Sequence, residues 1–334
     1  MLFLNCLGRI EDPHKVLDAA LTKLTLNGEP LTTVRARLTN YRSRFTFVNH
    51  LSVMLSMIIM TFDLLASVRH GHITVAREFW NVPLLIVSPL LFLFRRRMYF
   101  NINHNLSSLP HRFPLSVVLL SGLGFRFILF DGCLATAKFS SAIKRQFSTP
   151  LFPVSIESAS EETPALHSDK RFAVGVVGDF RSEKGDTEGL TQIMAGIAEI
   201  PGVDLTIGLR GPTLAIERAG LAAQFISTRS RSEYLAFLRN IDVLILFARK
   251  DRYYCRHSGT IMDAIACYAT PVVPNFPVLT SQISRPVQVG LTYDGLTEII
   301  DTIVDACRNR CVLRENIPRY LRARNSIDLC QSSY

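Results

Sequence analysis

Three small residues, Ser258, Gly259 and Thr260, come directly before an apolar stretch with the character of a short helix. The first N–H groups of a helix have no partner within it, and the aligned peptide dipoles make that end positive. Because small residues let a phosphate approach these groups, the stretch predicts a phosphate-binding helix start, to which the two hydroxyls can add hydrogen bonds. The alternative is that Ser258 only caps its helix, and the two roles are compatible.

Basic residues follow two strands that precede this helix in the chain. Arg181 and Lys184 lie in a loop after the strand expected over 171–180, and Arg210 follows the next strand. In a parallel sheet such loops leave the carboxyl edge, where open α/β folds bind their ligands. An arginine can hold an anion with two parallel hydrogen bonds and a lysine with a point charge. The alternative is a solvated loop in which Glu183 pairs locally.

The elements that must position these residues follow from an alternation of strand-like and helix-like stretches in both halves of the chain. Several of the strands are continuously apolar, which predicts parallel sheets covered by helices on both faces. The chain is therefore expected to be an α/β protein with two Rossmann-like, doubly wound domains that face each other across a cleft. The expected segments are an N-terminal domain at 1–150, a linker at 151–170 rich in Ser, Pro, Glu and Thr, a second domain at 171–310, and a C-terminal tail at 311–334 for which packing back on the first domain is one possibility.

Helices of the first half include its most apolar windows. Asp63 interrupts the window 51–68, and Arg95–Arg97 end the window 82–94, so neither provides the ~20 uninterrupted apolar residues of a membrane span. We interpret both as buried core helices. The full set of helices expected in this half is 12–28, 46–68, 82–96 and 112–123.

Charge is distributed unevenly over the 334 residues, whose net charge is +9. Residues 1–165 carry 17 Lys and Arg against 10 Asp and Glu, so most of the excess lies in the first half. This half is expected to face an anionic partner, such as a phosphorylated substrate or the inner surface of a membrane, or else to be a solvated basic face. Nucleic acid is not expected, because no nucleic-acid motif is present.

Cysteine usage and the first residues indicate the compartment. The seven cysteines are scattered without a Cys-x-x-Cys pair, which is typical of a reducing compartment and of a chain without a zinc site. The first residues lack the basic region and cleavage site of a signal peptide. We expect a cytoplasmic protein, with peripheral contact to the inner face of the plasma membrane as a possibility.

Four segments of the second half share a common order of elements: "VGVVGDFRSEKG" (174–185), "FISTRSRSEYLAFLRNIDVLILFA" (225–248), "SGTIMDAIACYATPVV" (258–273) and "VGLTYDGLTEIIDTIVDA" (289–306). Together they resemble the C-terminal domain of GT-B glycosyltransferases, above all the family 4-like group that uses nucleotide sugars. In the first half, the segment 99–113, "YFNINHNLSSLPHRF", is similar to a strand ending in His-Asn or His-Asp in exopolysaccharide glycosyltransferases of this type.

The resemblance implies roles for the donor-site residues. Arg181 and Lys184 would neutralise the diphosphate of the nucleotide sugar, and Ile226 would lie near the base. Asp263 takes the position of a glutamate that typically binds the ribose, and a carboxylate can accept from two vicinal hydroxyls. The alternative for Asp263 is an ion pair with a nearby Arg or Lys. Tyr253 lies in the loop before the helix and is a candidate donor contact.

The chain departs from the family pattern eight residues before Asp263. Many family members carry a glutamate there that contacts the sugar, whereas this chain has Cys255, which cannot hold sugar hydroxyls as a carboxylate does. The identity of the sugar and the stereochemical outcome therefore stay open.

Candidate catalytic residues lie in the first half. His104 corresponds to the histidine that touches the transferred sugar in the resembled enzymes, although a histidine at a strand end is often structural. An inverting mechanism needs a general base, and Glu11 or Asp12 in the first loop are the candidates. In a retaining mechanism the departing phosphate takes the proton. No Asp-x-Asp stretch occurs, so we expect metal-independent activity with no cofactor and no metal site.

The sequence thus favours a glycosyltransferase that moves a sugar from a nucleotide donor to a lipid-linked or polysaccharide acceptor in surface-glycan synthesis. The alternative from another class is a subunit that binds a nucleotide sugar without catalysis, which Cys255 suggests. A dinucleotide-binding protein is disfavoured, because no Gly-x-Gly-x-x-Gly follows a strand.

Overall fold

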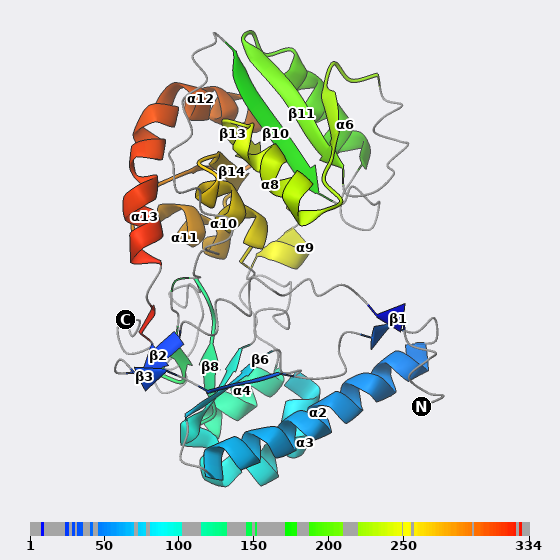
Figure 1. The fold of residues 1–334 in the computed structure, drawn as a ribbon, viewed down its shortest axis with the longest axis vertical. Helices are drawn as coiled ribbons and strands as arrows, with labels where there is room; N and C mark the ends of the chain where they lie inside the picture. Colours follow the sequence, from blue (N-terminus) through cyan, green and yellow to red (C-terminus); the bar gives the residue numbers. More distant parts are fainter. Residues whose placement is uncertain are drawn as a thin grey trace. The chain divides into compact units, whose positions relative to one another are not determined.

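The chain divides into two compact units in the computed structural model (Figure 1). Unit 1 comprises Met1–Phe152 together with Ser326–Tyr334, and unit 2 comprises Pro153–Asn325. The structure describes residues 8–9, 24–26, 29–30, 32–35, 41–42, 46–69, 73–77, 81–101, 115–131, 145–148, 151, 171–178, 187–209, 220–248, 250–254, 257–295, 297–324 and 327–328.

Unit 1 contains a five-stranded parallel sheet with the strand order β4-β6-β7-β8-β9. Each step moves to the next strand in the same direction, and right-handed crossovers then place the described connecting helices on one face of the sheet. Within this helical layer α3 contacts both α2 and α4. The elements are β4 (Thr32–Arg35), α2 (Thr46–Arg69), β6 (Thr74–Arg77), α3 (Asn81–Leu91), the 3-10 helix η2 (Phe92–Arg97), β7 (Met98–Asn101), α4 (Leu115–Gly122), β8 (Arg126–Ile128) and β9 (Phe147–Ser148).

Short strands complete unit 1. One antiparallel pair joins β1 (Gly8–Arg9) to β5 (Tyr41–Arg42). A second small sheet has the order β16-β2-β3, in which β2 (Leu24–Leu26) pairs antiparallel with β3 (Glu29–Pro30) and parallel with β16 (Ile327–Asp328). The end of the chain thus supplies a strand to the unit that contains its beginning.

Unit 2 contains a six-stranded parallel sheet with the strand order β12-β11-β10-β13-β14-β15. The strand order reverses between β10 and β13, which is the doubly wound topology that binds ligands at the carboxyl ends of the strands. The elements are β10 (Phe172–Gly178), α6 (Thr187–Ala198), β11 (Val203–Leu209), β12 (Gln224–Ser227), α8 (Arg231–Arg239), β13 (Val243–Ile245), α9 (Lys250–Tyr253), α10 (Gly259–Ala266), β14 (Thr270–Pro274), α11 (Pro277–Ser284), β15 (Leu291–Tyr293), α12 (Ile299–Glu315) and α13 (Ile317–Ala323).

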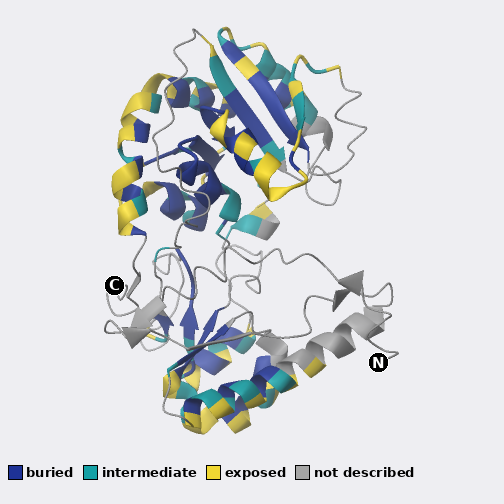
Figure 2. Ribbon diagram, viewed as in Figure 1, coloured by how far each residue is buried: buried dark blue, intermediate teal, exposed yellow. Residues whose placement is uncertain are grey.

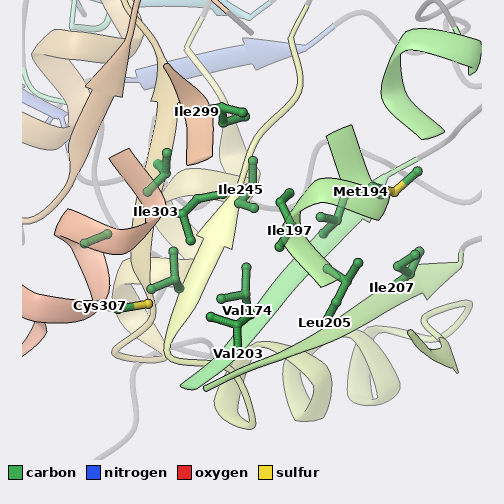
Figure 3. Packing of buried hydrophobic residues seen from close by; sticks show 14 of the residues in the cluster. Val174, Met194, Ile197, Val203, Leu205, Ile207, Ile245, Ile299, Ile303 and Cys307 are labelled. Atoms are coloured by element: carbon green, nitrogen blue, oxygen red, sulfur yellow. The ribbon is translucent and has the colours of Figure 1, made fainter. Parts of the chain in front are cut away.

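Two hydrophobic clusters cover the two faces of the unit 2 sheet. On one face, side chains of α6 such as Met194 and Ile197 and side chains of α12 such as Ile303 pack against β10, β11 and β13 (Figure 3). On the other face α8 and α10 contribute Phe237 and Ala264 to the second cluster. Both faces bury apolar side chains, which explains why the strands are continuously apolar rather than alternating.

Glycines allow α8 to lie close to the sheet. A Cβ added at Gly175 in β10 would stand 2.6 Å from Cδ1 of Ile241 and 3.0 Å from Cζ of Phe237. At Gly208 in β11 it would stand 2.9 Å from Cγ2 of Thr228. Because these two glycines have no side chains, there is room for the second cluster, to which α8 contributes.

A buried carboxylate, Asp242, ties together the amino ends of the unit 2 strands. Its backbone N–H donates to the carbonyl of Ala173 (2.7 Å), its Oδ2 accepts from the N–H of Ala173 (3.0 Å), and its carbonyl accepts from the N–H of Thr270 (2.8 Å). Its Oδ1 lies 3.1 Å from Nη1 of Arg310 and 3.7 Å from Nη1 of Arg314, both on α12. Burial is the main cause that lowers the pKa of Arg314. One side chain thus joins β10, β13 and α12.

The structure confirms the predicted α/β class with two parallel sheets. The prediction of a helix over 12–28 is wrong at its end, because Leu24–Leu26 form β2. Asn27-Gly28 joins β2 to β3, and this dipeptide between two short extended stretches is a strong hairpin signal. Helices α11 and α13 were not predicted, and the expected start of a tail at residue 311 falls inside α12.

The interpretation of the apolar windows as buried core helices is correct for one side of each helix only. Met60 and Leu64 of α2 are buried, but Phe62 between them is 65% exposed, and Leu93 of η2 is 83% exposed. Figure 2 shows exposed positions alternating with buried ones along α2 and α3. Among the residues that the structure describes, no helix combines the length and the apolarity that crossing a bilayer requires.

We predict that Asp242→Asn lowers the free energy of unfolding by about 3 kcal/mol, because it leaves the buried Arg314 and the partly buried Arg310 without their carboxylate. Urea unfolding followed by far-UV circular dichroism measures the loss. The matched control is Asp204→Asn, which removes an ion pair with Arg171 in which both side chains are more than half exposed, and which we expect to cost less than about 1 kcal/mol. Equal losses in the two variants would contradict a central role for Asp242.

Candidate functional site at the carboxyl edge of the second sheet

Two helices of unit 2, α8 and α10, begin beside each other at the carboxyl edge of the sheet. Helix α8 follows β12 after three residues, and α10 begins at Gly259, after β13. The two helices contact each other on the same face of the sheet. Their starts bring together the predicted site residues Ile226, Ser258, Thr260 and Asp263.

Ser258 occupies the N-cap position of α10 and is buried. Its backbone is extended, as a cap requires, but its hydroxyl makes no capping hydrogen bond to the helix. The structure therefore does not show the simple side-chain cap that the sequence offered as an alternative role for Ser258. Gly259 follows, and a Cβ added there would meet no atom within 4 Å among the described residues, apart from its chain neighbours and the backbone of its own helix. No described residue outside the helix therefore blocks the approach to Gly259.

Gln282 of α11 holds the backbone of Ser258 in place. The N–H of Ser258 donates to Oε1 of Gln282 (2.8 Å), and Nε2 of Gln282 donates to the carbonyl of Ser258 (3.2 Å). The Gln282 side chain is fully buried. Such a reciprocal pair replaces the hydrogen bonds that the backbone would otherwise make, and it fixes the direction from which the chain enters α10.

Helix α13 fixes Gln282 in turn. The hydroxyl of Tyr320 and Nη2 of Arg324 both donate to the carbonyl of Gln282, the latter at 3.2 Å. Arg324 is fully buried and also donates to the carbonyl of Arg285 (2.6 Å). A chain of hydrogen bonds therefore connects α13, α11 and the start of α10.

Asp263 forms an ion pair with Arg231. Nη1 of Arg231 donates to Oδ2 of Asp263 (2.7 Å) and Nη2 donates to Oδ1 (2.8 Å), so both oxygens of the carboxylate accept from one guanidinium. The Asp263 side chain is 6% exposed and that of Arg231 is 40% exposed. The hydrogen bonds to Asp263 are the main cause that raises the pKa of Arg231. This is the ion pair that the sequence offered as the alternative to a ribose contact, and the ribose contact stays a prediction.

Arg231 is a site residue that the sequence analysis missed. It lies in the first turn of α8, directly after Ser230, which caps the helix in a capping box with Glu233. A cation in a first turn is opposed by the helix dipole, so it needs a specific carboxylate nearby. That conflict was the available signal, and Asp263 resolves it.

Tyr234 of α8 lies against the first turn of α10 and contacts both Thr260 and Arg231. Its hydroxyl is hydrogen-bonded to the side chain of Thr260, and burial is the main cause that raises its pKa. The ring of Tyr234 also lies under the guanidinium of Arg231, 5.4 Å from its Cζ. Tyr234 is therefore a neutral phenol that positions both Thr260 and Arg231.

The other predicted site residues are distributed between described and undescribed parts of the chain. Ile226 of β12 packs against the second hydrophobic cluster, and Tyr253 is half-buried at the end of α9. The described residues do not include the remaining predicted site residues, which are Glu11, Asp12, His104, Arg181 and Lys184. They do not include Arg210 or Cys255 either.

Of the free cysteines that the structure describes, Cys267 and Cys307 are buried and Cys311 is exposed. Among the described residues, no group of three or more His, Cys, Asp or Glu side chains has the geometry to hold a metal ion. Burial raises the pKa of Cys267, at the end of α10, to about 11, and raises that of Cys307 to about 11 as well. Both are therefore protonated thiols at neutral pH and not nucleophiles.

No protein-family model and no curated protein matches this sequence. Solved structures, however, resemble the chain. The sucrose-phosphate synthase of Thermosynechococcus elongatus aligns over 88% of this chain and 78% of its own, with a TM-score of 0.57 and 14% identity. HepE of Anabaena in complex with UDP aligns over 82% and 80%, with a TM-score of 0.54 and 16% identity.

The chain has the GT-B fold. A structure of a GtfA/B complex also aligns, over 78% of this chain with a TM-score of 0.51 and 10% identity, and this chain spans 55% of the length of that one. At these identities the likeness carries the fold, and the residues of the site carry the chemistry.

We predict that Arg231 and Asp263 act as one unit in stability. Because the pair is only partly buried, Arg231→Gln and Asp263→Asn are each expected to lower the free energy of unfolding by about 2 kcal/mol. The double variant should lose clearly less than the sum, and urea unfolding of all four proteins measures the coupling. Additive losses would show that the two side chains act independently.

We predict that Gln282→Leu lowers the free energy of unfolding by about 2 kcal/mol, since it leaves the N–H and carbonyl of Ser258 buried without their partner. Thermal unfolding measures the loss. The control on the same helix is Ser284→Ala, which removes an exposed hydrogen bond to the carbonyl of Thr280 and should change stability by less than about 0.5 kcal/mol. An unchanged midpoint for Gln282→Leu would contradict its positioning role.

Proposed function

We propose that this protein is a glycosyltransferase that moves a sugar from a nucleotide-sugar donor to an acceptor. The observation that carries the proposal is the start of α10, which Gln282 holds in place at the carboxyl edge of a parallel sheet. No described residue outside the helix blocks the approach to Gly259 there. Unpaired N–H groups at a helix start bind and neutralise phosphate, and the departing group in this reaction is a nucleoside diphosphate.

The comparisons support the donor class. HepE, which shares the fold, is known in complex with UDP-glucose, with UDP and glucose, and with UDP. In the proposed site the start of α10 at Ser258 to Thr260 holds the diphosphate, and Arg181 and Lys184 add positive charge. Ile226 and Tyr253 line the nucleoside and donor side.

Asp263 keeps a proposed contact with the ribose. Both of its oxygens accept from Arg231, so a ribose hydroxyl would have to use a second lone pair on one of them. Arg231 then positions the carboxylate rather than competing with the ligand. The proposed catalytic residues are His104, near the transferred sugar, and Glu11 or Asp12 as a base if the reaction inverts configuration.

The finer proposal is a metal-independent, family 4-like enzyme of surface-glycan synthesis. Its acceptor would be a lipid-linked glycan or a polysaccharide, and the enzyme would work in the cytoplasm in peripheral contact with the inner face of the plasma membrane. What supports this is the sequence resemblance to exopolysaccharide glycosyltransferases and the basic, apolar first half of the chain. Positive charge from Arg and Lys with a helix dipole can replace a metal at the diphosphate.

We predict release of nucleoside diphosphate when the protein is incubated with a panel of UDP-, GDP- and dTDP-sugars together with a crude lipid-linked acceptor. Lys184→Ala should weaken donor binding about tenfold or more, as expected for the loss of a charge-assisted hydrogen bond. Arg308→Ala is the control, since Arg308 is an exposed cation on α12. Isothermal titration calorimetry measures the affinities.

The outcomes separate the proposals. Donor binding without release under any acceptor would favour the non-catalytic subunit, to which Cys255 also points. No binding of any nucleotide sugar would overturn both. Loss of turnover in EDTA that Mn²⁺ or Mg²⁺ restores would count against metal independence, and unchanged affinity of Lys184→Ala would remove that residue from the site.

A further inference from the structure

Large apolar side chains are exposed on the helical layer of unit 1. Of the thirteen that are exposed among the described residues, only Ile300 and Val312 lie in unit 2. The other eleven form what we call the apolar face: Leu55, Ile58, Phe62, Leu85, Ile86, Leu90, Phe92, Leu93, Leu115, Leu119 and Leu123. A concentration of this kind on one layer of one unit is not typical of a surface that faces only water.

The spacing shows that the apolar face is built by the helices themselves. On α2, Leu55, Ile58 and Phe62 recur at intervals of three and four residues, which places them on one stripe. The opposite side of the helix buries Met60 and Leu64 against the unit. A helix at the surface normally carries polar residues opposite its buried stripe, whereas α2 is apolar on both sides.

Helices α3 and α4 continue the same pattern beside α2. Ile86 and Leu90 of α3 are 61% and 62% exposed, and Leu115 of α4 is 72% exposed. Because α3 contacts both α2 and α4, the three stripes lie on neighbouring helices of one layer. Figure 2 shows exposed positions along the helices of this layer. The apolar face is therefore continuous across several helices rather than a set of single residues.

Arginines border the apolar face at one end. Arg69 ends α2, and Arg95–Arg97 end η2, so all four precede the amino ends of strands β6 and β7. Arg96 and Arg97 are exposed, and Arg95 stacks over the ring of Phe92 at 3.8 Å. Helices α2, α3, η2 and α4 contain one carboxylate, Asp63, which is half-buried.

We propose that the apolar face and its arginine border dock on the surface of a membrane that contains anionic lipid. Apolar side chains enter the boundary between headgroups and acyl chains, while the arginines extend their stems along it and bring their guanidinium groups to lipid phosphates. A second copy docked through the same helices is a poorer fit, since it would present the same arginines, and the one carboxylate of these helices, Asp63, is half-buried. The inference rests on the proposed function for the expectation of a membrane contact, and it names the residues that make that contact. It does not depend on sugar transfer.

Sedimentation with lipid vesicles tests the proposal on the full chain. Vesicles of equal parts phosphatidylglycerol and phosphatidylcholine are expected to sediment the protein, with about tenfold or more tighter binding than vesicles of phosphatidylcholine alone. Binding should weaken as salt rises, since exposed charges are screened. Equal binding to the two kinds of vesicle, or none to either, overturns the proposal.

Three variants locate the surface. A triple exchange of Ile86→Gln, Leu90→Gln and Leu93→Gln should abolish sedimentation, and Arg96→Gln with Arg97→Gln should weaken it about tenfold while leaving the fold unchanged. The matched control exchanges Ile300→Gln and Val312→Gln in unit 2 and should bind as the original protein does. Circular dichroism and the unfolding midpoint verify folding, which exchanges at exposed positions are expected to preserve.

Two further readouts separate this inference from its rivals and from the proposed function. If light scattering finds a dimer that the triple exchange converts to a monomer, and the vesicles fail to bind, the apolar face is an interface between copies and the proposal is overturned. Nucleotide-sugar binding is measured on the same variants without lipid and should not change. A protein that sediments with anionic vesicles but binds no donor supports the docking face and contradicts only the proposed function.

Discussion

A single buried carboxylate organises unit 2. Asp242 accepts from β10, is itself the residue before β13, receives a hydrogen bond from the start of β14, and pairs with two arginines of α12. Removing a charge from water is unfavourable unless it is paired and hydrogen-bonded, so these partners must all be in place together. These contacts fix the amino edge of the sheet, which is opposite to the carboxyl edge where doubly wound sheets bind ligands.

The carboxyl edge is organised by a different kind of contact. Tyr320 and Arg324 of α13 hold the carbonyl of Gln282, whose side chain holds the backbone of Ser258. The start of α10 is therefore positioned through hydrogen bonds from a helix more than fifty residues later in the chain. Preorganised backbone N–H groups bind a charged group without a further cost of ordering, which is what a site for a diphosphate requires.

The helices of unit 1 bury apolar side chains against the sheet and expose other apolar side chains on their outer side. In the aromatic core of the unit the ring centroid of Phe100 lies 5.9 Å from that of Phe125 and 6.1 Å from that of Phe127. The layer formed by α2, α3 and α4 covers the sheet. The outer side of that layer is apolar as well, and burial within the unit does not account for it. The same composition therefore forms both the contact with the sheet and the exposed apolar face.

Local pattern alone determined much of this protein: the alternation of strands and helices, the helix start at Ser258 and the excess of positive charge in the first half, since periodicity and residue type act over a few residues. Sequence reasoning failed where the cause was distant. The pairing of Arg231 with Asp263 joins two helices 32 residues apart, and the hold of Gln282 on Ser258 crosses 24 residues. The two sides of α2 are equally apolar in sequence, so only packing against the sheet decided which is buried. Tertiary structure decides such features because a side chain's partner is set by which helices share a face of the sheet.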